Sequence, residues 1–498
     1  MLKNIILLLL PVLTIGQTKI NYQIFYSDKA ENEGLKIQVS YKSKVATDST
    51  YFYYSNKVWG QKNLSNCVKF TKSENPEYNF KIVADSSRIV VYHPKARNIS
   101  FSYHINQDIK EKTPQSKNRP FIEKEFFHVL GQSLFTVPEE IFEPKIDDPK
   151  ITANIEWLNF PKGFVIHNSF GSNILKQHLK IKLWSELYHS LFIGGDYRIK
   201  PFDYLNKRVY FAIRGEWQNE YQDDKLFSAL KKTISTQREF WLDNSFDYYT
   251  IIMTPTITQK DSIFKGQSIH GSGVKNGFMI ESTNNPFNNF STIKYMFNHE
   301  MMHDWIGGKI PLKNEELNYW FSEGFTDYYS YKNRLRNKDL SFTEWLNAFN
   351  TEVIKAHWKN PEKNIANYRI KDDFWKNYNI QKIPYRRGAI FAFWLDNQIL
   401  KKSNYTKSLD DLMREILKVC TTENRKFSDE LFLDMAQKYL DKDISSFFQK
   451  HIINGEDFEF KQEDFIDEFK IEFVEKIPIV VGGKEPKSRY IPASVLLP

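Results

Sequence analysis

Residues 298–308, NHEMMHDWIGG, contain two histidines four positions apart, with a glutamate directly after the first. Positions four apart on a helix lie on one face, one turn above the other, so His299 and His303 can bind the same metal ion. Glu300 is rotated about 100° from His299 and can reach a water molecule at that ion without binding the ion itself. This stretch therefore predicts two metal ligands and a general base on one helix.

The flanking sequence predicts where this helix begins and ends. Residues 286–292, PFNNFST, offer polar capping side chains for a start near Ser291. The glycine pair at 307–308 predicts its end, because glycine readily ends a helix. Both histidines and the glutamate therefore fall within the predicted helix.

A catalytic zinc ion usually has three protein ligands and one open position. Because Cys67 and Cys420 are the only cysteines, a thiolate-rich site is excluded, and histidine and carboxylate must hold any metal. Glu323 alone would be taken as a surface carboxylate. It lies, however, in the aromatic stretch LNYWFSEGFTDYY, and a carboxylate buried there needs a cation. We therefore predict Glu323 as the third ligand, with Asp327 one turn further along to accept a hydrogen bond from a ligand histidine.

The length of the chain, 498 residues, predicts two or three domains. A hydrophobic content of 41% is enough for a large core, and the net charge of +8 is modest for this size. No block of lysine and arginine is long enough to indicate a nucleic-acid partner. No segment after the first residues is apolar enough to suggest a membrane span.

Residues 1–17, MLKNIILLLLPVLTIGQ, have the features of a signal peptide. Lys3 precedes an apolar stretch of about ten residues, whereas roughly 20 are needed to span a bilayer. The alternatives are a retained anchor or a buried first strand. We predict an exported protein, periplasmic or secreted.

Changes in sequence character along the chain predict a multidomain α+β fold. Short alternating segments such as LKIQVSY and NISFSYHI indicate strands, and later segments such as LDDLMREILKVC have helical periodicity. Ser341 and Glu344 have the spacing of a capping box at a helix start. The predicted parts are a signal peptide at 1–17, a β-rich domain at 18–150, a mixed α/β domain with the metal motif at 151–340, a helical domain at 341–460 and a short C-terminal tail at 461–498.

HEMMH, followed after nineteen residues by EGFTDYY, resembles the gluzincin metallopeptidases. The similarity is closest to the glycyl aminopeptidase family, with the aminopeptidase N family as a larger relative. Three further segments are similar to elements of these families: HNSFG at 167–171, FIGGDYRI at 192–199 and YRRGAIFAFWLD at 385–396. The resemblance covers roughly residues 155–455.

This resemblance implies a thermolysin-like catalytic domain with one zinc ion per chain, held by His299, His303 and Glu323. It implies a peptide substrate and aminopeptidase-like activity. A tyrosine in the last of the similar segments donates a hydrogen bond to the transition state in these families, which points to Tyr385 as a second catalytic residue beside Glu300.

The chain also departs from the pattern of these families. Arg387 stands where they usually have lysine, and the tail is too short for the PDZ domain that the glycyl aminopeptidases often carry. The segment GSGVKNGF at 271–278 matches their glycine-rich substrate strand, so Gly271 and Gly273 are predicted to bind substrate. Lys275 stands where the families have a glutamate that binds the substrate's ammonium group.

The charge of Lys275 leaves the substrate open. If this lysine faces the site, it disfavours a substrate ammonium, and amino-blocked peptides are preferred. Alternatively Lys275 points to solvent, or Glu281 takes the place of the missing glutamate in a shifted register.

Taken together, the sequence predicts an exported zinc metallopeptidase with aminopeptidase-like activity, because the expected catalytic groups are all present. One alternative is a zinc hydrolase of the same scaffold that acts on blocked peptides or a non-peptide substrate. Another is a non-enzymatic exported binding protein. The predicted partner is a peptide substrate, with no nucleic acid and no membrane span after signal removal, and no oligomeric state is predicted.

Overall fold

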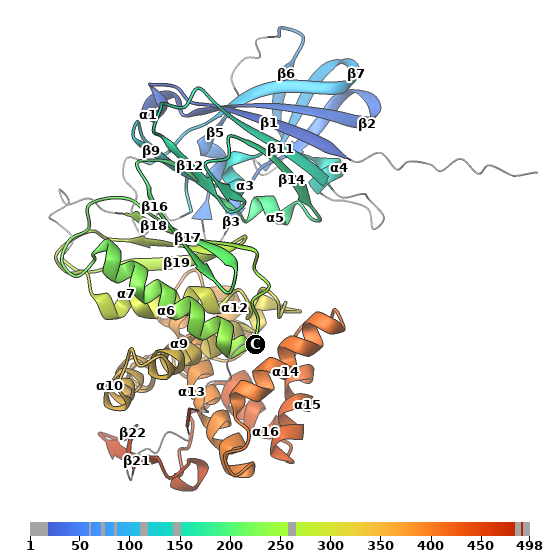
Figure 1. The fold of residues 1–498 in the computed structure, drawn as a ribbon. Helices are drawn as coiled ribbons and strands as arrows, with labels where there is room; N and C mark the ends of the chain where they lie inside the picture. The colour runs from blue at the N-terminus through green and yellow to red at the C-terminus, as the bar shows by residue number, and fades with distance from the viewer. Residues whose placement is uncertain are drawn as a thin grey trace, which may run out of the picture. The chain divides into compact units, whose positions relative to one another are not determined.

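The computed structural model describes residues 18–58, 61–70, 75–83, 87–109, 118–142, 151–256, 265–483 and 490–491. The chain forms two compact units, shown with their labelled elements in Figure 1. The first extends to Arg198 and includes Val274–Asn276; the second comprises Ile199–Gly273 and Gly277–Pro498. The predicted signal peptide at 1–17 lies outside the described residues.

The described part of the first unit is built on a larger and a smaller β-sheet, with β3 and β4 as a separate two-stranded sheet. Along β1 (Lys19–Phe25), Ile20, Tyr22 and Ile24 are buried while their neighbours are more exposed, as expected when side chains alternate between the two faces of a strand. In the described part of this unit the larger sheet has the order β14-β11-β1-β2-β7-β5, with β10 paired to β2 and β6 to β7. The smaller sheet has the order β13-β12-β15-β9-β8.

The other elements of the first unit have the following bounds: α1 (Ala30–Glu33), β2 (Leu35–Tyr53), β3 (Lys57–Val58), β4 (Gln61–Lys62), β5 (Val68–Lys69), β6 (Asn79–Val83), β7 (Arg88–Ile105), β8 (Phe121–Ile122), β9 (Phe126–Leu130), α3 (Gly131–Leu134), β10 (Val137–Pro138), α4 (Glu139–Phe142), β11 (Ile151–Leu158), β12 (Val165–Asn168), β13 (Gly171–Ser172), β14 (Lys176–Ile181), α5 (Ser185–Tyr188) and β15 (Leu191–Gly195).

The described part of the second unit combines a five-stranded sheet, of order β16-β17-β18-β20-β19, with helices and with the two-stranded sheet β21-β22. Strands β17, β18 and β20 pair in parallel, and β18 is buried along nearly its whole length, as is usual for a parallel strand covered on both faces. The strands are β16 (Arg198–Tyr204), β17 (Lys207–Ile213), β18 (Tyr248–Pro255), β19 (Ile269–Val274) and β20 (Gly277–Ser282). The glycine-rich strand β19 lies at one edge of this sheet, opposite the edge formed by β16.

The helices that follow in the second unit share one core with this sheet. Each fully buried Phe in that core contributes about 1.5–3 kcal/mol relative to an exposed one. The elements are α6 (Asp223–Trp241), α7 (Phe290–Met302), α8 (Tyr319–Ser322), α9 (Gly324–Arg336), α10 (Phe342–Ala348), α11 (Ala356–Trp358), α12 (Asn367–Asp373), α13 (Tyr378–Lys402), α14 (Leu409–Thr422), α15 (Asp429–Leu440), α16 (Ser445–Phe448), β21 (Phe469–Val474) and β22 (Ile477–Gly482).

The predicted α+β multidomain class is confirmed, whereas the units divide elsewhere than predicted. The first unit extends to Arg198 rather than ending at residue 150. The reason is that β11 lies between β1 and β14 in the larger sheet, so the chain after residue 150 completes that sheet. Residues 341–460 do not form a separate domain, because their helices share a core with α7 and α9.

Three further features bear on the sequence predictions. The capping box of Ser341 and Glu344 is present at the start of α10. Cys67 and Cys420 are both buried and free. Within the described ranges, every helix is either too short or too polar to traverse a bilayer.

Candidate metal centre

Helix α7 carries the two histidines and the glutamate of the motif. The side chain of Asn289 caps its start by accepting hydrogen bonds from the backbone N–H groups of Ser291 and Thr292. The regular helix ends at Met302, earlier than the glycine pair at 307–308 predicted, because the chain leaves it through hydrogen-bonded turns. His303 caps the end and keeps helical dihedral angles (φ −64°, ψ −16°), so it still lies one turn above His299.

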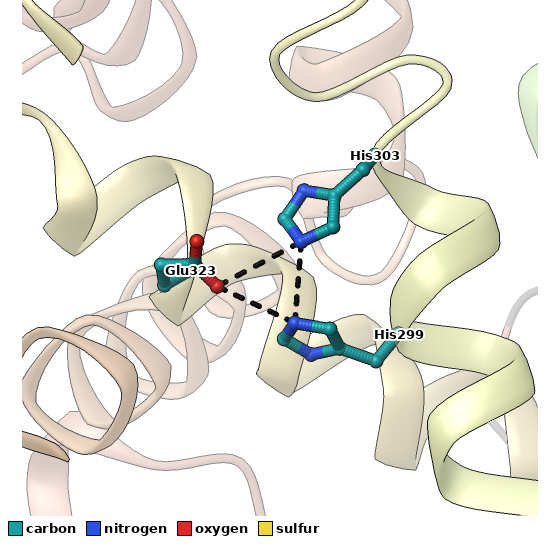
Figure 2. Close-up of side chains that lie close together, drawn as sticks. All are labelled: His299, His303 and Glu323. Atoms are coloured by element: carbon teal, nitrogen blue, oxygen red, sulfur yellow. Dashed lines mark hydrogen bonds and ion pairs between the residues drawn. The ribbon is translucent and has the colours of Figure 1, made fainter. Parts of the chain in front are cut away.

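The structure brings His299, His303 and Glu323 together, as Figure 2 shows. The Nε2 atoms of the two histidines are 3.2 Å apart. The Oε2 atom of Glu323 lies 3.3 Å from His299 Nε2 and 3.7 Å from His303 Nε2. Ligand atoms that bind zinc tetrahedrally at 2.0–2.2 Å are about 3.3–3.6 Å apart. The triangle therefore fits a zinc ion.

The hydrogen bonds behind the two imidazoles also suit a metal. His299 Nδ1 is 2.9 Å from Oδ1 of Asp327, and His303 Nδ1 is 3.3 Å from the carbonyl oxygen of Ile306. Both partners are acceptors, so each neutral imidazole carries its hydrogen on Nδ1 and presents the Nε2 lone pair to the triangle. Glu323 Oε2 is buried and faces the two Nε2 atoms, which carry no hydrogen in this tautomer. A zinc ion would satisfy all three atoms.

The electrostatics of the triangle favour a charged third ligand. Burial raises the pKa of Glu323, but the imidazoles of His303 and His299 and a hydrogen bond from Tyr385 outweigh it and lower the pKa to about 2. Burial lowers the pKa of His299, but hydrogen bonds to Asp327 and Glu323 outweigh it and raise the pKa to about 10. Binding of a metal must therefore release a proton from His299.

Asp327 orients His299 from the side opposite the triangle. It sits one turn beyond Glu323 at the start of α9, and its Oδ1 atom also accepts a hydrogen bond from the hydroxyl group of Tyr295. Sequence reasoning missed Tyr295, although it lies four positions before His299 on α7, which is the spacing of neighbours on one helix face. The hydroxyl group of Tyr295 therefore helps to orient the carboxylate of Asp327, which in turn orients His299.

The glycine-rich strand β19 runs directly beside Glu300. A Cβ atom added to Gly271 would lie 2.2 Å from Cγ of Glu300, and one added to Gly273 would lie 4.0 Å from Cβ of His303. Glu300 itself is buried. Only a residue without a side chain allows the strand to approach the predicted base this closely, so Gly271 lies where a substrate-binding strand is expected.

Tyr385, on α13, completes the group of predicted catalytic residues. Its ring is stacked on that of His299, with centroids 5.9 Å apart and an interplanar angle of 14°. Burial, with Glu323 and Asp327 nearby, raises the pKa of Tyr385 well above its usual value. The hydroxyl group therefore keeps its proton at neutral pH and can donate a hydrogen bond at the metal site.

Two glycines let the helices that carry Glu323 and Tyr385 cross in contact. A Cβ atom on Gly324 would lie 2.4 Å from Cα of Gly388, and one on Gly388 would lie 1.9 Å from the carbonyl oxygen of Trp320. Gly324 directly follows Glu323, and Gly388 lies one turn beyond Tyr385. We call this contact the glycine crossing; it fixes the separation of the third ligand and the tyrosine through the backbone.

Two charged residues in or near the predicted substrate strand, Lys275 and Glu281, each have a charged or polar partner of their own. Lys275 belongs to the first unit, where its ammonium group is 2.9 Å from Oε2 of Glu186. Glu281 is buried, with Oε2 2.5 Å from Nε2 of His270. Because side chains alternate along a strand, and Gly271 faces Glu300, the paired His270 and Glu281 face away from the base.

Arg387, which stands where the related families have lysine, is buried and makes no direct contact with the three ligands. Its guanidinium group donates hydrogen bonds to the carbonyl oxygens of Ile452, Lys363 and Ile365. These bonds join α13 to one segment that precedes it in the chain and to one that follows it. The role of Arg387 there is structural.

Comparison with known proteins agrees with this arrangement. Residues 273–451 match the model of the Peptidase family M1 domain, whereas no curated protein matches the chain in sequence. An aminopeptidase N family protein from Idiomarina loihiensis has a similar structure, with a TM-score of 0.72 and 14% identity over 88% of this chain and 77% of that one. The prediction of a gluzincin metallopeptidase related to aminopeptidase N is confirmed.

A second similar structure is an M1 zinc metallopeptidase mutant from Deinococcus radiodurans, bound to a Tyr-Ser-Ala substrate. Its TM-score is 0.51 and its identity 11%, over 90% of this chain and 95% of that one. At such low identity the two similarities in structure establish a shared fold.

Proposed function

We propose that this zinc metallopeptidase removes residues from the amino terminus of peptides. The proposal starts from the match of residues 273–451 to the Peptidase family M1 domain. The observation that carries the proposal is the triangle of His299, His303 and Glu323, with Glu300 and Tyr385 beside it. The tripeptide bound by the Deinococcus radiodurans protein is consistent with a short peptide substrate.

Zinc bound by His299, His303 and Glu323 would polarise the scissile carbonyl group and acidify a water molecule. Glu300 takes a proton from the attacking water, whose oxygen forms a bond to the carbonyl carbon. Tyr385 donates a hydrogen bond to the carbonyl oxygen as negative charge develops there. The C–N bond then breaks, and Glu300 passes the proton to the leaving amine.

The ion pair of Lys275 with Glu186 argues against a preference for amino-blocked substrates. Because its charge is paired with Glu186, it is not left to repel a substrate ammonium. Export of the enzyme is part of this proposal and rests on the sequence of residues 1–17 alone.

The proposal predicts a difference between a free and a blocked peptide. An unblocked tripeptide should lose its first residue. N-acetylation should reduce kcat/KM by about 100-fold, since it removes the positive charge of the amino terminus, and charge-assisted binding of that group contributes roughly 3 kcal/mol. A chelator should stop hydrolysis and added zinc should restore it. Liquid chromatography of the products measures both.

Two results would contradict the proposal. Equal cleavage of the acetylated peptide would support a hydrolase of blocked peptides, and no cleavage of any peptide by zinc-loaded protein would support a binding protein.

Replacing Tyr385 tests the role of the hydroxyl group. Tyr385→Phe should lower kcat by about 100-fold or more and leave KM and zinc content nearly unchanged, as expected for a donor that acts mainly in the transition state. Tyr439→Phe, which removes a hydroxyl group bonded to Glu415, is the matched control and should retain activity. Wild-type kinetics for Tyr385→Phe would show that this tyrosine serves packing alone.

A further inference from the structure

One lysine stands beside the catalytic tyrosine without an acidic partner. Lys382 lies three positions before Tyr385 on α13, and its ammonium nitrogen is 4.6 Å from the centroid of the Tyr385 ring. The same nitrogen is 5.7 Å from the ring of Tyr378, which is 69% exposed. Among the described residues, no carboxylate lies within ion-pair distance of Lys382. Its charge is therefore available to something outside the chain.

The neighbouring cations on this helix are engaged differently. Arg386 donates a hydrogen bond to the carbonyl oxygen of Ala356, and Arg387 is bonded to three carbonyl oxygens. Both arginines therefore have structural partners. Lys382 contacts only aromatic faces in the described part of the chain, and such contacts orient an ammonium group while leaving its hydrogens free to donate.

The negative charge of the site indicates what Lys382 can do there. Even with a zinc ion bound, the carboxylates of Glu300, Glu323 and Asp327 leave the site with one negative charge in excess, and each has a role as base, ligand or ligand partner. A substrate that brings a further carboxylate would be repelled by them unless a cation accompanies it. Lys382 is positioned to supply that cation, with flexible donors that suit a carboxylate.

The distance to the reacting bond indicates which substrate group Lys382 can reach. Tyr385 contacts the scissile carbonyl oxygen in the proposed reaction, and an extended peptide advances about 3.3–3.6 Å per residue. An ammonium 4.6 Å from the centre of that ring can therefore hold a carboxylate about one residue from the scissile bond.

We propose that Lys382 forms a subsite for a carboxylate on the residue that follows the scissile bond, an inference that rests on the proposed peptidase function. In a dipeptide this is the C-terminal carboxylate. In a longer peptide it is the side chain of aspartate or glutamate. The enzyme then prefers dipeptides, or peptides with an acidic second residue, over neutral peptides of the same length.

The test compares zinc-loaded wild type with Lys382→Gln and Lys382→Arg on Ala-Ala and Ala-Ala amide. Wild type should favour the free acid in kcat/KM by about tenfold, the effect of one charge-assisted hydrogen bond of about 1.4 kcal/mol. Lys382→Gln should remove this preference and Lys382→Arg should keep most of it. Lys376→Gln is the control, because Lys376 is an exposed lysine paired with Asp373.

A second pair of substrates separates the two sources of the carboxylate. A preference for Ala-Glu amide over Ala-Gln amide that is lost in Lys382→Gln supports recognition of an acidic side chain. If only the preference for Ala-Ala over its amide depends on Lys382, the subsite reads the C-terminus.

Three outcomes would overturn the inference. Equal cleavage of acid and amide by wild type removes the subsite and leaves the proposed peptidase function standing. An equal loss of kcat on both substrates in Lys382→Gln shows that the lysine only positions Tyr385. Cleavage of no substrate by zinc-loaded wild type rejects the peptidase function and the subsite together.

Discussion

Replacing Glu300 with glutamine is expected to abolish most hydrolysis while zinc stays bound. The substitution keeps the size of a side chain that packs against Gly271, but glutamine cannot accept the proton of the attacking water. Loss of a positioned general base lowers kcat by about 10²–10⁴-fold. Glu300 supplies none of the three ligand atoms, which come from His299, His303 and Glu323. The metal content of the variant should therefore equal that of wild type.

The measurement is kcat and bound zinc in the same preparation, with Glu430→Gln, an exposed glutamate of α15, as the control. Loss of zinc from Glu300→Gln would show that this residue is a ligand. Unchanged turnover would mean that another group acts as the base.

Replacing Glu323 with alanine is expected to give the opposite pattern, in which zinc itself is lost. Only two histidines would remain to hold the ion, and the buried position of the Glu323 carboxylate would no longer carry a negative charge. Zinc affinity should fall by more than the 10–100-fold that is typical for residues that support a ligand. Asp327→Asn, which keeps all three ligands and alters only the partner of His299, is the comparator and should fall within about that range.

Bound zinc after dialysis against a graded chelator measures the order of these variants, and thermal unfolding of each shows that the fold persists. Wild-type zinc retention in Glu323→Ala would remove Glu323 from the ligands. A greater loss in Asp327→Asn than in Glu323→Ala would reverse the assigned roles of the two carboxylates.

The metal ligands could be predicted from sequence because their positions follow the period of a helix. His299 and His303 are one turn apart on α7, and Asp327 is one turn from Glu323 on the next helical stretch. The spacing within each pair therefore predicts that its two side chains lie on one helix face. The aromatic residues around Glu323 predict that it is buried. The resemblance to a known family was needed for Tyr385, which is one of 27 tyrosines and has no local pattern of its own.

What could not be predicted depends on pairings between distant parts of the chain. The extension of the first unit to Arg198 follows from β11 lying beside β1, which pairs segments more than a hundred residues apart. The partner of Lys275 is Glu186, on the short helix α5, and no sequence pattern connects the two. The close approach of Gly271 to Glu300 likewise depends on the register of an edge strand against a helix.

The glycine crossing has a consequence for how such an enzyme can evolve. Any larger residue at Gly324 or Gly388 must push apart the helices that carry Glu323 and Tyr385, so a single substitution there disturbs metal affinity and turnover at once. Lys382 lies nearly two turns before Gly388 on the same α13 and contacts the rings of Tyr378 and Tyr385 through its side chain. Under the proposed subsite, an exchange of Lys382 alters which peptides are accepted, while the glycine crossing further along α13 keeps Glu323 and Tyr385 in place.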